Sequence, residues 1–171
     1  MTKRFFVFAA LSFALALPAA AQCANQAQYE NLRGVRGLRL LVMGGRSLPP
    51  SQRVELDRAV MLFLGRLNTA GLVMWQLPGT PPPTATGLHP ATIANAILDV
   101  SVNDGSTLLT EDDLVHVKLY VQETGVVRDM VLPVVTWTRA RAFHGGPSGR
   151  GLEITTGWLG AQLVESFACS R

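Results

Sequence analysis

The sequence has 171 residues, of which 48% are apolar and 16% charged, and it contains two cysteines. A chain of this length and apolar content is typical of one folded domain and too apolar for a disordered protein. The formal net charge is +3, and it falls to +1 without Lys3 and Arg4, because 13 basic residues then face 12 acidic ones. This balance argues against nucleic acid as a partner, since phosphate binding requires a basic surface.

Residues 1–21 have the three parts of a secretory signal peptide. A short basic stretch is followed by the apolar run 5–17 and then by three consecutive alanines that end at Ala21. This order is typical of export and cleavage, and the apolar run is too short to span a bilayer as a lasting helix. We therefore expect cleavage after Ala21, leaving a mature domain at residues 22–171. This domain would be periplasmic or secreted and would have no transmembrane segment.

The two cysteines, Cys23 and Cys169, lie at opposite ends of the expected mature chain. Export implies an oxidising compartment, where an even number of cysteines usually forms disulfides. Lipid attachment at Cys23 is the alternative, but it requires a small residue before the cysteine, and Gln22 stands there. We favour a disulfide between Cys23 and Cys169 over a lipoprotein or a pair of free thiols.

The first half of the mature chain predicts a strand, a helix and a long loop. Loose alternation predicts a strand over residues 35–43, and two prolines then precede a helix over residues 52–68. One face of that helix is apolar and consists of Leu56, Val60, Phe63, Leu64 and Leu67. The segment 78–92 contains five prolines and two glycines, so we expect a surface loop there.

The second half predicts an antiparallel meander of three strands over residues 95–103, 114–122 and 126–138, with a tight turn at residues 123–125. In the middle strand, alternation directs one set of residues inward: Val115, Val117, Leu119 and Val121. The residues between them, His116, Lys118 and Tyr120, would point outward. Pro133 predicts that the last strand is an edge strand or is bulged.

A closing helix is predicted over residues 152–167, although its opening, Leu152 to Thr156, could instead be extended. Gly157, Gly160 and Ala161 would let this helix lie close to the sheet. The order of elements is then βαβββα. We predict an α+β fold in two layers, with about four mainly antiparallel strands and both helices on one face. The other face of the sheet would be open. This order resembles that of several small bacterial envelope proteins that assist assembly or secretion.

Three arrangements of residues suggest chemistry, but each lacks a necessary part. Asp99, Ser101 and His116 would share the open face, yet a flat strand supplies no oxyanion donors for nucleophilic catalysis. The glycine-rich loop 144–151 lacks the lysine of a phosphate loop and the second glycine of a nucleophile elbow, although Arg150 could hold an anion there. The three histidines lack metal-ligand spacing. We predict no catalytic, metal or cofactor site.

We therefore favour a non-enzymatic accessory or binding protein of the bacterial envelope, with another envelope or secreted protein as its partner. The open sheet face, the strand near Pro133 or the proline-rich loop would make the contact. Candidate binding residues are His116, Lys118, Tyr120 and Arg150. One alternative is a small-ligand binder with a pocket between the sheet and the loops 78–92 and 144–151. Another is a small hydrolase that uses His116 or His144.

Overall fold

The computed structural model describes residues 32–102, 114–145 and 150–170. The predicted signal peptide and Cys23 lie outside these ranges. The elements in chain order are β1 (Gly37–Met43), η4 (Gly45–Ser47), α1 (Pro50–Thr69), β2 (Val73–Gln76), η5 (Pro83–Ala85), η6 (Pro90–Thr92), β3 (Ile93–Val102), β4 (Leu114–Val127), β5 (Met130–His144) and α2 (Gly151–Cys169).

In the described part of the chain, the strands form one five-stranded mixed sheet in the order β2-β1-β3-β4-β5. β1 pairs in parallel with both β2 and β3, whereas β3, β4 and β5 pair antiparallel. The prediction of about four mainly antiparallel strands was therefore close but missed β2 and the parallel half. β2 has only four residues, which is too short for a periodic pattern.

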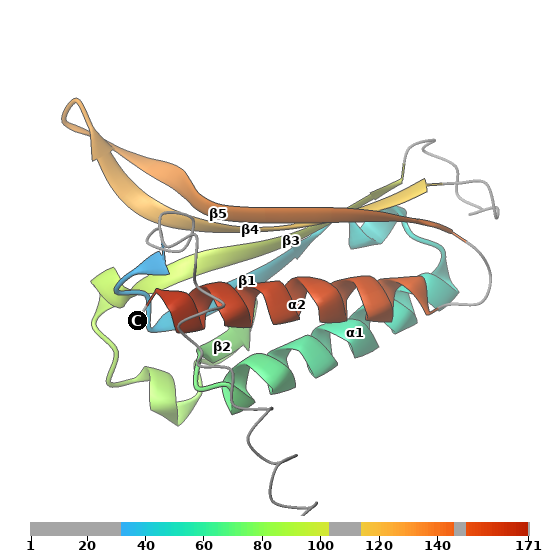
Figure 1. Ribbon diagram of the computed structural model, residues 1–171, viewed down its shortest axis with the longest axis horizontal. Coiled ribbons are helices and arrows are strands. Elements are labelled where there is room, and N and C mark those ends of the chain that lie inside the picture. The colour runs from blue at the N-terminus through green and yellow to red at the C-terminus, as the bar shows by residue number, and fades with distance from the viewer. Residues whose placement is uncertain (1–31, 103–113, 146–149, 171) are drawn as a thin grey trace, which may run out of the picture.

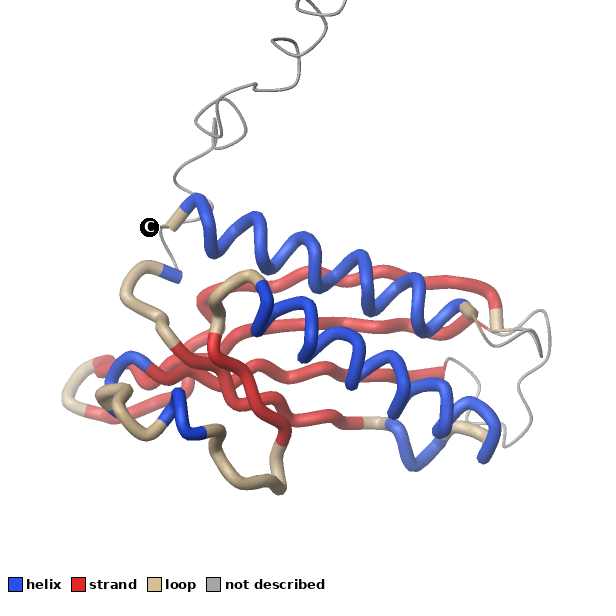
Figure 2. The backbone as a smooth tube through the Cα atoms, turned by 90° about the horizontal axis from the view of Figure 1, so that it is seen from below, coloured by secondary structure: helices blue, strands red, loops and turns tan. Residues whose placement is uncertain are grey.

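Both long helices cover the same face of the sheet, as Figures 1 and 2 show from two directions. The apolar face predicted for the first helix packs into the core through Leu56, Val60, Phe63 and Leu67. The four inward residues predicted on β4 are fully buried: Val115, Val117, Leu119 and Val121. The two-layer α+β architecture is thus confirmed, with the apolar core between the sheet and the helix pair.

The small residues of α2 have a different role from the predicted one. A Cβ atom at Gly160 would lie 2.8 Å from Cδ2 of Phe63, and one at Gly157 would lie 2.8 Å from a guanidinium nitrogen of Arg66. Phe63 and Arg66 both belong to α1, so Gly157 and Gly160 permit close packing of α2 on α1 rather than on the sheet.

Polar contacts also hold α2 in place. The carboxylate of Glu55, from α1, accepts a hydrogen bond from the backbone N–H of Glu153 at 3.5 Å. This contact supplies an acceptor to the first turn of α2, whose N–H groups have no partner within the helix. Near the other end of α2, the Nε1 atom of Trp137 on β5 donates to the Oγ atom of Ser166 at 2.9 Å in the buried core.

The turn predicted at residues 123–125 is wrong. β4 continues to Val127, and the chain reverses at Arg128 and Asp129, which have positive φ values of 49° and 65°. Two central residues with positive φ are the geometry of the primed turns that suit hairpins. Gly125 instead pairs with Leu132 inside the hairpin. Because neither turn residue is glycine, the sequence pattern favoured the wrong position.

Candidate functional site

The three predicted outward residues of β4 lie on the face of the sheet opposite the helices. Lys118 is exposed, whereas His116 and Tyr120 are half-buried. The ammonium group of Lys118 lies 5.3 Å from the centroid of the Tyr120 ring, within the range of a cation–π interaction. Lys118 also stands directly opposite Asp99 of β3, which places opposite charges side by side. These residues form one continuous polar surface.

Asp99, Ser101 and His116 also share this face, because Ser101 pairs directly with His116. In the described part of the chain, no hydrogen bond joins the side chains of Ser101 and His116. Nucleophilic catalysis requires the base within hydrogen-bond reach of the nucleophile. The residues that the structure describes also contain no group of three or more His, Cys, Asp or Glu side chains that could hold a metal ion.

Arg150 does not belong to the same surface. It lies immediately before α2 and is exposed, so it belongs to the helix layer, whereas the β4 residues point away from that layer. Cys169 lies at the end of α2 and is not a free cysteine. Since Cys23 lies outside the described residues, the bridge between the two cysteines stays a prediction.

One end of the open face is covered by the proline-rich loop. Leu88 of this loop reaches the sheet, where its Cδ1 atom lies 2.8 Å from the position of a Cβ atom at Gly37. Trp75 of β2 lies 3.5 Å from the same position and is only 8% exposed. The loop therefore covers the face at the amino end of β1, beside Trp75 of β2, while Lys118 on β4 stays accessible.

The most apolar surface lies on the hairpin of β4 and β5. β3 pairs with β4 only as far as Gln122, so from Glu123 onward β4 pairs with β5 alone. In Figure 1 this end of the hairpin curls away from the two-layer body. We call residues 123–135 the apolar ribbon. Its exposed apolar side chains are those of Val126, Met130, Val131, Leu132, Val134 and Val135.

The apolar ribbon exposes apolar side chains on both of its faces. Val126 and Val131 are cross-strand partners on one face and are 72% and 69% exposed. Leu132 and Val134 point to the other face, because successive side chains of a strand alternate between its two faces, and both are also exposed. Contiguous exposed apolar surface of this kind usually marks an interaction site. The only hint in the sequence was the run Val131–Val135, which has no polar alternation.

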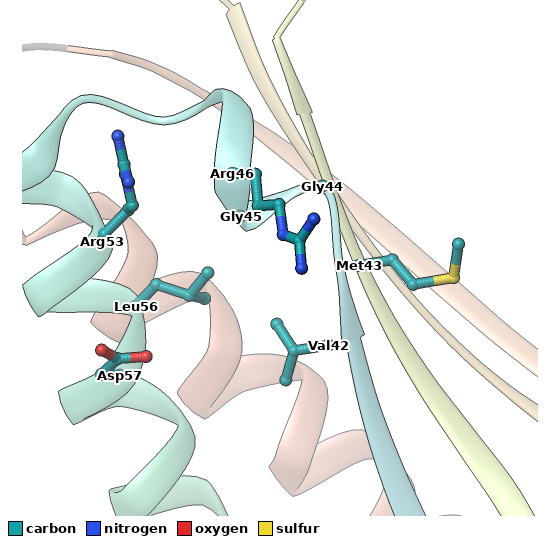
Figure 3. A pocket seen from close by; sticks show the side chains of 8 residues that line it. All are labelled: Val42, Met43, Gly44, Gly45, Arg46, Arg53, Leu56 and Asp57. Atoms are coloured by element: carbon teal, nitrogen blue, oxygen red, sulfur yellow. The ribbon is translucent and has the colours of Figure 1, made fainter. Parts of the chain in front are cut away.

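A cavity of about 450 Å³ opens at the carboxyl end of β1, next to η4 and the first turns of α1. Figure 3 shows Arg46 extending from η4 towards the space between Val42 of β1 and Leu56 of α1. Arg53 and Asp57 line the cavity from α1. The cavity thus combines two arginines, one carboxylate and apolar walls.

Comparisons with known proteins add little to this geometry. No family model matches the chain, and no curated protein matches it. A solved structure of a hypothetical protein, CT253, from Chlamydia trachomatis is similar with a TM-score of 0.41 and 13% identity, covering 80% of this chain and 99% of that one. A minor lipoprotein from Acinetobacter baumannii is similar with a TM-score of 0.30 and 13% identity, covering 80% and 92%. At these values the likeness carries no inference about function.

Within the described residues, no helix is both long and apolar enough to cross a membrane.

Proposed function

We propose that this protein is exported and acts as a non-enzymatic binding protein of the bacterial envelope, through contacts with another protein. The signal-peptide pattern of residues 1–21 supports export. The single observation that carries the binding role is the apolar ribbon, which projects beyond β3 and exposes six apolar side chains. Export would bring this surface into contact with other envelope proteins.

Side chains of the ribbon, rather than its backbone edge, make the contact. β5 is an edge strand, as the position of Pro133 predicted, and an exposed edge can in general accept an added strand. Pro133 lacks a backbone N–H, so the edge loses a donor in the middle of the ribbon. A partner with an apolar groove can instead enclose both faces, because both carry exposed valine or leucine.

A paired substitution tests this proposal. Replacing both Val126 and Val131 with threonine keeps two β-branched residues but exchanges one methyl group for a hydroxyl in each. Burying a methyl group contributes about 0.8 kcal/mol, and an unpaired hydroxyl costs at least as much again. The two sites together should therefore lose at least about 3 kcal/mol of binding free energy, so the double variant should bind the partner at least about a hundredfold more weakly, since 1.4 kcal/mol is tenfold. Its thermal stability should hardly change, because both sites are exposed.

Capture from an envelope extract of the native organism, with quantification of each co-purified protein, gives the readout. The matched control replaces Val54 and Ile154, which are 71% and 61% exposed on the helices, with threonine. The proposal expects one partner that the wild type and the control retain and that V126T/V131T loses. Equal capture by all three chains, or no specific capture by the wild type, would contradict it.

A further inference from the structure

The cavity at the carboxyl end of β1 lies where the order of strands in the sheet departs from their order along the chain. From β1 the chain passes through α1 to β2 on one side, whereas β3, the other neighbour of β1, pairs with β4 on the opposite side. The strand that follows β1 in the chain therefore lies on one side of β1, and the strand that follows β3 lies on the other side. In open sheets with parallel strands, crevices at such points are the usual sites for ligands.

Glycine permits the close approach of strands that shapes this corner. Gly44 follows β1 with a left-handed φ of 76°, and a Cβ atom there would lie 1.8 Å from the carbonyl oxygen of Val100 on β3. Only glycine allows the backbone to turn so close to β3. The turn leads into η4, from which Arg46 extends into the space between β1 and α1.

The charges in the cavity favour an anion. Two arginines, Arg46 and Arg53, line it together with a single carboxylate, that of Asp57. The Nε atom of Arg53 donates to the carbonyl oxygen of Leu48 at 2.8 Å, and Figure 3 shows the guanidinium group of Arg53 directed away from that of Arg46. Among the described residues, neither guanidinium forms an ion pair with a carboxylate. Such guanidinium groups bind the two oxygens of a carboxylate in a planar, bidentate geometry.

We propose that this cavity binds a small organic carboxylate with a short aliphatic chain. Arg46 would hold the carboxylate, Arg53 would add positive charge from the rim, and Val42 and Leu56 would contact the chain. With the carboxylate of Asp57 counted against the two arginines, the cavity lining carries one net positive charge, which matches a monoanion better than a phosphate dianion. A volume of about 450 Å³ lies within the range of small-molecule sites. The cavity and the apolar ribbon lie towards opposite ends of β4, so the two proposals can fail separately.

Titration of the mature chain with hexanoate, followed by NMR of the backbone amides of Gly44 and Gly45 and of the Arg46 side chain, tests this site. Hexanoate should give saturable shifts at low ionic strength, and 1-hexanol at the same concentrations should give less than a tenth of them. Hexyl phosphate should bind more weakly than hexanoate. R46Q should weaken hexanoate binding at least tenfold with unchanged melting temperature, since Arg46 is exposed.

The matched control is R36Q. Arg36 is also an exposed arginine, but it lies before the other end of β1. R36Q should bind hexanoate like the wild type. Shifts that do not saturate, equal shifts with 1-hexanol, or equal loss of affinity in R46Q and R36Q would overturn the proposal. Tighter binding of hexyl phosphate would overturn the assignment of a carboxylate.

Discussion

Replacing Gly160 with alanine tests how closely the two helices pack. Alanine favours a helix over glycine by about 1 kcal/mol, so propensity alone predicts a gain in stability. The new Cβ atom, however, would lie 2.8 Å from Cδ2 and 3.0 Å from Cε2 of Phe63, whose side chain is buried. Overpacking of a core costs about 1–3 kcal/mol. The rigid ring cannot swing away, so we expect a net loss of about 1 kcal/mol in the free energy of unfolding.

Gly65 of α1 provides the matched control. It also lies inside a helix, but it is exposed, and nothing lies within 4 Å of a Cβ atom placed there. G65A should therefore raise the free energy of unfolding by up to about 1 kcal/mol through propensity alone. Gly157 should behave more like Gly65, because its close neighbour is the flexible end of Arg66. The expected difference between G160A and G65A is about 2 kcal/mol.

Thermal unfolding by circular dichroism, supported by urea titration, measures this difference. For a domain of this size, 1 kcal/mol shifts the melting temperature by about 2–4 °C, so G65A should melt about 4–8 °C above G160A. Equal stability of the two variants, or a higher melting temperature for G160A, would refute the close packing of α2 on Phe63. The slope of the urea transition should stay unchanged, which shows that the substitutions alter stability and not the extent of unfolding.

Three further sets of substitutions test contacts at the ends of α2. Burial raises the pKa of Glu55, against the opposing effect of hydrogen bonds from the first turn of α2, so folding favours its protonated form. Its stabilising contribution is present at low pH and decreases as the pH rises through the folded pKa. E55Q should be at least as stable as the wild type in urea at pH 7 and should lose that advantage in acid. E55A removes the hydrogen-bond acceptor of the first turn of α2, so it should lower the free energy of unfolding by about 1 kcal/mol. W137F leaves the buried hydroxyl of Ser166 without its donor and should lower the free energy of unfolding by about 1–2 kcal/mol. If the lost hydrogen bond is the cause, the double variant W137F/S166A should recover part of this stability. Serine at Cys23 or Cys169 should cost a few kcal/mol if the two are bridged, whereas alkylation of both thiols in the native, never-reduced protein would show that they are not.

Some features of the fold followed from periodicity alone. The burial of one face of α1 and the alternation along β4 are local patterns, because each residue's direction is set by the geometry of its own element. Pro133 predicted an edge strand or a bulge, since the missing N–H excludes proline from a regular central strand, and β5 is an edge strand. Together these patterns led to a two-layer α+β fold with an open face.

Other features depended on contacts between distant segments. β2 has four residues and becomes a strand because it pairs with β1. The turn at Arg128 and Asp129 contains no glycine, so hairpin pairing rather than local propensity places it. The exposure of the apolar ribbon follows from where β3 stops pairing with β4, and the cavity at β1 forms where the end of that strand meets η4 and α1. Strand register and chain direction are properties of pairs of segments, and for that reason only the tertiary structure could decide them.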